Sequence, residues 1–142
     1  MRARCDEPPP PELRRAIEQL NAGELFEQHE TLEELWRRTR TPVRDLYHGI
    51  IQIGVGLYHW SHGNFHGAAV LMAEGIEHLR PFAPLCQGVD VDRLIADAMA
   101  LREELLVLGA ERMAERDARR ALTVRYAFGG SSAGSSTGTN AG

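Results

Sequence analysis

The segment that most constrains the fold of this chain is residues 46–60, which would be apolar on nearly every side if it were helical. At helical spacing it carries Leu46, Tyr47, Ile50, Ile51, Ile53, Leu57 and Tyr58. A helix of this kind lies either in a membrane or inside a protein, surrounded by other elements. A membrane span needs about 20 predominantly apolar residues, whereas this segment is shorter and contains His48, Gln52 and His59. It therefore predicts the central helix of a soluble helical protein.

Turn residues divide the remaining sequence into further helices. Typical helix boundaries occur at residues 8–11, 21–23, 41–42, 62–64 and 80–81. A last helix begins after Asp90, a residue type that caps helix N-termini, and its apolar side chains recur at helical spacing. We therefore predict an all-α fold, a compact bundle of about five helices made of two tetratricopeptide-like helical hairpins plus a C-terminal helix.

With 142 residues, the chain is the size of one domain with a single core. We expect a flexible proline-rich N-terminus at residues 1–11 and one helical domain at residues 12–125. Residues 126–142 form a Gly/Ser-rich tail that we expect to be disordered. Residues 110–128 could add a weaker, charged helix.

Composition narrows the classes of function. The formal net charge of −4 is modest and neither sign forms a long block, so neither a nucleic-acid nor a membrane partner is predicted. Cys5 and Cys86 form no disulfide framework and match no metal-binding spacing, and the N-terminus does not resemble a signal peptide. We therefore expect reduced cysteines and a cytoplasmic location. The sequence contains neither a Gly-x-Ser-x-Gly motif nor a glycine-rich phosphate loop. It therefore gives no support for nucleophilic catalysis by serine or for phosphate binding by such a loop.

Polar residues occur on helix faces that should be buried. On a helical wheel of residues 24–40, Leu25 and Trp36 lie on the buried face. His29 and Glu33, one turn apart, fall on the same face. A buried carboxylate without a partner costs several kcal/mol. Glu33 is therefore either part of a structural pair, with His29 or with a neighbouring helix, or part of a ligand-binding or catalytic site.

The central helix carries a second polar stripe. His48, Gln52 and His59 share one of its faces. We predict that this stripe faces His29 and Glu33 across one helical hairpin. Imidazole and carboxylate groups from two helices can bind a divalent metal such as zinc, manganese or iron, or act as an acid–base pair. The alternative is a hydrogen-bonded polar core without a ligand.

The predicted ligand-binding pocket is lined by His29, Glu33, Trp36, Gln52 and His59, and its predicted metal ligands are His29, Glu33 and His59. No catalytic residue is assigned. If the protein is an enzyme, we expect metal-assisted hydrolysis, with Glu33 as base or ligand and His29 as ligand. Three further histidines, His62, His66 and His78, are left outside the site because they flank a turn or lie near a helix end.

The sequence resembles a known family. Residues 26–36 resemble the signature of domain-of-unknown-function family 309, small prokaryotic proteins with a His-x3-Glu-x2-Trp motif. In this chain the motif positions are His29, Glu33 and Trp36. Residues 49–68 are similar to the family's second conserved stretch, so the resemblance covers about residues 12–80. One departure is His48, where the family more often has glutamine. The resemblance implies an all-α bundle and no established activity, with metal binding by the motif as a suggestion.

These observations support two classes of function. The first is a cytoplasmic helical protein that binds a divalent metal ion or a small polar ligand in the His/Glu pocket. The alternative is a protein-interaction module with a tetratricopeptide-like surface and no catalytic activity, in which the inward polar residues only specify the packing. A third hypothesis is a homodimer formed through the apolar stripe of the last helix.

Overall fold

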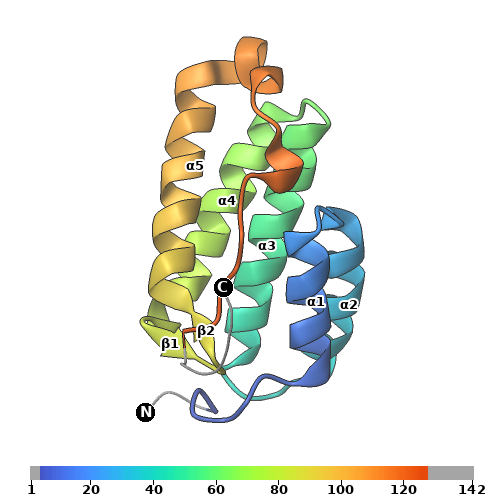
Figure 1. Ribbon diagram of the computed structural model, residues 1–142, viewed down its shortest axis with the longest axis vertical. Helices are drawn as coiled ribbons and strands as arrows, with labels where there is room; N and C mark the ends of the chain where they lie inside the picture. The colour runs from blue at the N-terminus through green and yellow to red at the C-terminus, as the bar shows by residue number, and fades with distance from the viewer. Residues whose placement is uncertain (1–3, 128–142) are drawn as a thin grey trace.

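Five α-helices and one short β-hairpin make up residues 4–127, the part of the chain that the computed structural model describes (Figure 1). The helices are α1 (Pro11–Asn21), α2 (Leu25–Arg38), α3 (Arg44–Ser61), α4 (Phe65–Leu79) and α5 (Val91–Arg112). The other elements are the antiparallel strands β1 (Leu85–Cys86) and β2 (Val89–Asp90) and the 3₁₀ turns η1 (Arg80–Phe82), η2 (Met113–Glu115) and η3 (Ala118–Arg120). No helix within residues 4–127 is long and apolar enough to cross a membrane. The predicted all-α bundle is confirmed.

Local signals in the sequence begin and end these helices. Gly23 and Gly63 follow α1 and α3 with φ angles of +83° and +77°, a left-handed conformation that glycine adopts without strain. The side chain of Asn64 accepts a hydrogen bond from the backbone N–H of Gly67 at the start of α4, and Asp90 caps α5 in the same way. Because these signals are local, the predicted helix boundaries lie close to the observed ones.

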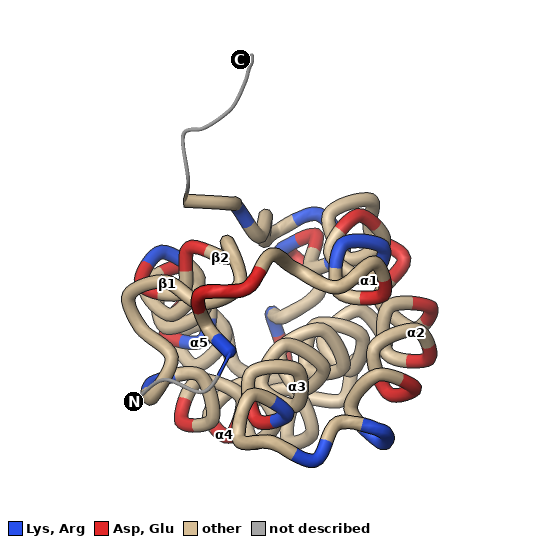
Figure 2. The backbone as a smooth tube through the Cα atoms, turned by 90° about the horizontal axis from the view of Figure 1, so that it is seen from below, with Lys and Arg blue, Asp and Glu red and all other residues tan. Residues whose placement is uncertain are grey.

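Helix α3 lies between α2 and α4 and is buried along most of its length (Figure 2). Its contact with α4 is close because two glycines face each other. A Cβ on Gly49 would lie 3.0 Å from the carbonyl oxygen of Gly75, and a Cβ on Gly75 would lie 2.8 Å from the carbonyl oxygen of Gly49. The two backbones therefore approach more closely than side chains at these positions would allow. The prediction of a central helix is confirmed.

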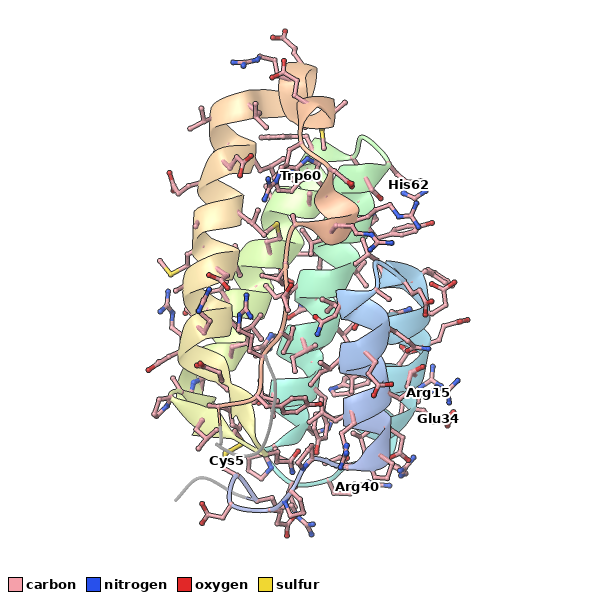
Figure 3. The ribbon with its side chains drawn as sticks, viewed as in Figure 1. Cys5, Arg15, Glu34, Arg40, Trp60 and His62 are labelled. Carbon is pink, nitrogen blue, oxygen red and sulfur yellow. A yellow bond between two sulfur atoms is a disulfide. The ribbon has the colours of Figure 1, made fainter. Side chains whose placement is uncertain are left out.

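A disulfide joins Cys5 to Cys86 across a sequence separation of 81 residues (Figure 3). Beside it, the backbone N–H of Gln87 donates to the carbonyl oxygen of Cys5 at 2.8 Å. The hydroxyl of Tyr47 donates to Oε1 of Gln87, also at 2.8 Å. The prediction that both cysteines are reduced is wrong, because the fold brings together two residues that are distant in sequence. Disulfides are typical of oxidising compartments, so the cytoplasmic location stays a prediction.

The chain beyond α5 does not form the weaker helix expected at residues 110–128. Gly109 breaks the helical path with a φ angle of +73°, and the chain then returns along the bundle towards the β-hairpin (Figure 1). The side-chain amide of Asn21 donates to the carbonyl oxygen of Val124 at 3.0 Å and accepts from its N–H at 2.8 Å. This returning segment therefore fastens the end of α1 to the C-terminal part of the chain.

The predicted flexible ends are described only in part. Cys5 holds the N-terminal segment against β1 through the disulfide, which differs from the expected flexible N-terminus. At the other end, the N–H of Ala127 donates to the carbonyl oxygen of Gly88 at 2.8 Å. Residues 1–3 and 128–142, which include most of the predicted tail, lie outside the described residues.

The disulfide should contribute substantially to stability, because it closes a long loop in the unfolded chain. Replacing Cys5 and Cys86 by serine is expected to lower the free energy of unfolding by about 2–4 kcal/mol. Urea denaturation measures this change. A reducing agent should lower the stability of the parent protein by a similar amount and leave the double variant unchanged. Equal stability of the parent with and without reductant would contradict the disulfide.

Candidate functional site

The first polar stripe, on α2, lies at the edge of the helix interface rather than inside it. The side chains of His29 and Glu33 are 29% and 33% exposed, and their Nε2 and Oε2 atoms are 3.8 Å apart. Oε1 of Glu33 lies 3.4 Å from Nη2 of Arg37. Phe26, which marks the same edge of the helix, is 48% exposed. Glu33 therefore has a cationic partner on its own helix and needs no metal to compensate its charge.

The polar side chain of α2 that points inward is Gln28, which the sequence analysis missed. It is fully buried, and neither of its amide atoms has a hydrogen-bond partner within residues 4–127. Its amide packs against α3 at Gly54, where a Cβ would lie 2.7 Å from Cδ of Gln28. On a helical wheel Gln28 falls between the buried Leu32 and Leu35, so periodicity alone could have found it.

The second polar stripe, on α3, faces α4. Oε1 of Gln52 lies 2.6 Å from Nδ1 of His78, and Nε2 of Gln52 donates to Oε1 of Glu74 at 3.0 Å. Because the amide nitrogen of Gln52 faces a carboxylate, its oxygen faces the imidazole and accepts a hydrogen bond from Nδ1–H of His78. Gln52 itself is only 7% exposed. The predicted residue Gln52 is thus joined to His78, which the sequence analysis had left outside the site.

Three aromatic rings from three helices lie in a row beside this hydrogen-bond chain. The ring centroids of Trp36 on α2 and His48 on α3 are 5.1 Å apart, and those of His48 and His78 on α4 are 4.6 Å apart. We call Trp36, His48 and His78 the ring row. The ring row joins Trp36 to the hydrogen-bonded side chains of Glu74, Gln52 and His78. We call the ring row, Gln52 and Glu74 together the polar face.

Burial lowers the pKa of His48 below its ordinary value of 6.5, and the neighbouring His78 lowers this pKa further. Arg44 acts in the same direction, whereas Asp45 and Glu74 oppose it. The imidazole of His48 is therefore neutral at pH 7 and carries a lone pair on one ring nitrogen.

The structure does not bring the three predicted metal ligands together. His59 lies in the last turn of α3, where its Nδ1 is 3.3 Å from Nδ2 of Asn64. His29 and Glu33 lie on α2, and within residues 4–127 neither of them makes a hydrogen bond or ion pair with His59. Across residues 4–127, no group of three or more His, Cys, Asp or Glu side chains is arranged to hold a metal ion.

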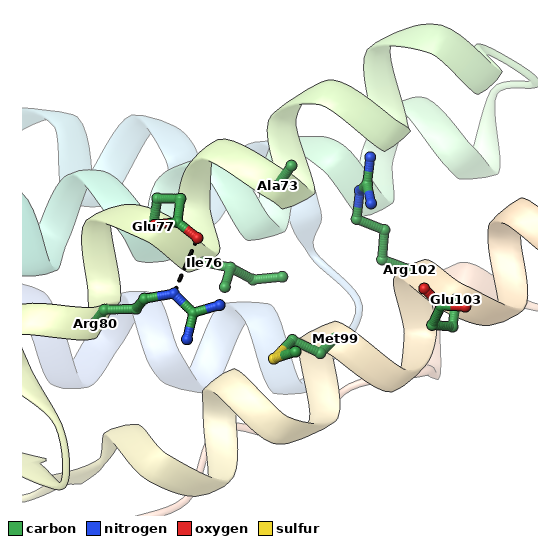
Figure 4. A pocket seen from close by; sticks show the side chains of 7 residues that line it. All are labelled: Ala73, Ile76, Glu77, Arg80, Met99, Arg102 and Glu103. Atoms are coloured by element: carbon green, nitrogen blue, oxygen red, sulfur yellow. Dashed lines mark hydrogen bonds and ion pairs between the residues drawn. The ribbon is translucent and has the colours of Figure 1, made fainter.

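A separate cleft of about 210 Å³ lies between α4 and α5 (Figure 4). It is lined by Ala73, Ile76, Glu77, Arg80, Met99, Arg102 and Glu103. Nε of Arg80 donates to Oε2 of Glu77 at 2.9 Å, and Nε of Arg102 donates to the carbonyl oxygen of Ala69 at 2.8 Å. The cleft contains none of the predicted site residues, and several of its polar groups are already paired.

The fold described above is that of an all-α helical bundle. Residues 13–71 match the family described as domain of unknown function (DUF309). This match supports the family predicted from the sequence, over residues 13–71 of the chain. The chain is also similar to the uncharacterised protein YpuF of Bacillus subtilis (strain 168), with 34% identity over 90 residues. The match covers 61% of this chain and 52% of that relative, so the chain spans about half the length of the curated protein it matches.

The segment that matches the family contains only the α2 and α3 residues of the polar face. It includes α2, α3 and the first part of α4, and therefore Trp36, His48 and Gln52. Glu74 and His78 lie beyond its last residue. The α4 side of the polar face was therefore not accessible from the family motif, and only the packing of α3 against α4 reveals it.

The contact between Gln28 and Gly54 can be tested by a double-variant cycle. An alanine in a helix is usually more stable than a glycine by about 1 kcal/mol, but Gly54→Ala would overlap the buried amide of Gln28. We expect Gly54→Ala to lower the free energy of unfolding by about 1–3 kcal/mol. In a Gln28→Ala background the same change should be neutral or stabilising. Chemical denaturation measures all four proteins, and the same loss in both backgrounds would contradict the contact.

The lowered pKa of His48 predicts a pH dependence of stability. Below about pH 6.5, the imidazole at position 48 takes up a proton more readily in the unfolded chain than in the folded protein. Stability attributable to His48 is therefore complete above this pH and is lost as the pH falls through the lower pKa of the folded state.

His48→Gln removes this titration and serves as the comparison. Between pH 7.5 and pH 5, we expect the parent to lose more unfolding free energy than His48→Gln, since the other histidines are common to both proteins. Parallel pH profiles would show that the pKa of His48 is not lowered. Histidine NMR titration should also place the pKa of His48 nearer its ordinary value in His78→Asn.

Proposed function

We propose that the protein binds a divalent transition-metal ion through His48 and His78, on the α3–α4 side of the polar face. The observation that carries the proposal is the hydrogen-bond chain from Glu74 through Gln52 to His78. Metal-binding histidines commonly donate their second ring N–H to a carbonyl or carboxylate group, which orients the ring and fixes its tautomer. Here Oε1 of Gln52 accepts a hydrogen bond from Nδ1–H of His78, so that the neutral imidazole carries its lone pair on Nε2.

His48 supplies the second imidazole. Its ring lies beside that of His78, and neither of its ring nitrogens is hydrogen-bonded within residues 4–127. Imidazole nitrogens suit zinc, copper, nickel and iron. A site with two histidine ligands would leave the remaining coordination positions to solvent or to a small ligand, and would bind its metal more weakly than a closed structural site.

The test is designed to separate this site from the one predicted on α2. His29 belongs in the comparison because its Nδ1 is buried without a hydrogen-bond partner in the described part of the chain. The protein, purified without chelator and without a histidine tag, is analysed for bound metal and then titrated with Zn²⁺ at pH 7.5 by calorimetry. His66→Ala, which removes an exposed histidine, is the control.

We expect binding of about one equivalent of Zn²⁺ to the parent, with affinity reduced at least tenfold in His78→Ala. Gln52→Leu should reduce the affinity by about 10- to 100-fold, because the ring of His78 loses its orienting partner. His29→Ala and His66→Ala should bind as the parent does. Loss of binding in His29→Ala but not in His78→Ala would place the metal at His29, Glu33 and His59 instead. Absence of binding in the parent would favour the protein-interaction module.

A further inference from the structure

The connection between α2 and α3 forms a cleft whose lining contains only arginine and threonine. The cleft has a volume of about 390 Å³ and is lined by Arg37, Thr39, Arg40 and Arg44. Figure 3 labels Arg40 at the same end of the molecule as Cys5, and Figure 2 shows basic segments beside this end of α3. A neighbouring cleft is also lined by Arg40, but its lining includes the acidic residue Glu7. The cleft lined by arginine and threonine, which we call the basic cleft, is therefore the stronger candidate for an anion-binding site.

Two of the arginines in this region keep an uncompensated charge. Arg37 pairs with Glu33, and the nearby Arg38 pairs with Glu12. By contrast, Arg40 makes no ion pair or hydrogen bond within residues 4–127. Arg44 contacts backbone carbonyls and an aromatic ring but no carboxylate.

The guanidinium of Arg44 is held in place before any ligand arrives. Its Nε donates to the carbonyl oxygen of Thr39 at 3.0 Å, and its Nη2 donates to that of Trp36 at 3.4 Å. Its Cζ lies 4.5 Å from the centre of the Trp36 ring. A guanidinium that is already ordered loses less conformational entropy when it binds a ligand.

Arg44 also lies at a helix end where a positive charge is unfavourable. It is the first residue of α3, and the helix macrodipole disfavours a cation at a helix N-terminus. Arg37 and Arg38, in the last turn of α2, are by contrast at a favourable helix end. An anion in the cleft would compensate Arg40 and Arg44 and would interact favourably with the N-terminus of α3.

We infer that this cleft binds the phosphate group of a small phosphorylated molecule. A phosphate carries a charge of about −1.5 to −2 at pH 7, which matches the two uncompensated guanidinium groups. Its oxygens accept paired hydrogen bonds from guanidinium N–H groups in the fork geometry of arginine. The inference does not rest on the proposed metal site, because it uses none of the histidines.

Inorganic pyrophosphate and phosphate are the probes, added to the full chain at constant ionic strength. Binding is measured by calorimetry and by the fluorescence of Trp36, whose ring lies against Arg44. The other tryptophan, Trp60, is 2% exposed and donates from Nε1 to the carbonyl oxygen of Met113 at 2.8 Å, so it should not respond. Trp36→Phe should therefore abolish the fluorescence change.

We expect saturable binding of one pyrophosphate, weakened about tenfold or more by Arg40→Gln, since this variant removes charge-assisted hydrogen bonds to the phosphate. Arg93→Gln removes the same charge from α5, where Arg93 pairs with Asp97, and should leave binding unchanged. Arg44→Lys keeps the charge but loses the fork, and should also weaken binding.

Three results would overturn the inference. The first is the absence of saturable binding at millimolar pyrophosphate and phosphate. The second is equal weakening by Arg40→Gln and Arg93→Gln, which would indicate a non-specific charge effect. The third is binding of citrate as tight as that of pyrophosphate, which would show that the cleft accepts carboxylates rather than phosphate.

Discussion

The close approach of α3 and α4 at Gly49 and Gly75 is the constraint on which the polar face depends. The missing side chains let the two backbones come within van der Waals contact. One turn along α3, Gln52 then reaches both Glu74 and His78, which flank Gly75 on α4. With bulkier residues at the crossing, the helices would be further apart and this hydrogen-bond chain would not form. Each glycine costs about 1 kcal/mol of helix propensity relative to alanine, and close packing of the central helix offsets that cost.

The buried amides on the two sides of α3 differ in their hydrogen bonding. On the α4 side, the amide of Gln52 is buried and both of its atoms are hydrogen-bonded. On the α2 side, Gln28 is buried against Gly54 with neither amide atom paired within residues 4–127. Desolvated amides without partners oppose folding. The amide on the α4 side is therefore held in one orientation, whereas the unpaired amide on the α2 side is an unfavourable feature that the surrounding apolar packing must outweigh.

The arginines near the α2–α3 connection fall into two groups, those paired with a carboxylate and those without one within residues 4–127. Arg37 and Arg38 complete ion pairs and suit the C-terminal end of α2. Arg40 and Arg44 do neither, yet Arg44 is ordered by carbonyl groups and by Trp36. Trp36, a member of the ring row, thus contacts both His48 and Arg44. The metal site and the phosphate site that we propose are therefore neighbours, with Trp36 in contact with a residue of each.

The sequence by itself determined the local features of this protein. Helical periodicity identified the apolar central helix, and turn and capping residues such as Gly63 and Asp90 located the helix ends, because these signals act within a few residues. The motif around His29 and Glu33 predicted the family whose model matches residues 13–71. Periodicity could not show which edge of α2 is buried, because His29 and Glu33, which were placed on the buried face, are partly exposed.

The tertiary structure alone decided which distant residues meet. The disulfide between Cys5 and Cys86 and the pairing of Gln52 with His78 join residues far apart in the sequence. The return of the chain after Gly109 places its C-terminal segment against α1 and β2. No local pattern specifies such contacts, because they depend on how the helices cross and on how closely their backbones approach.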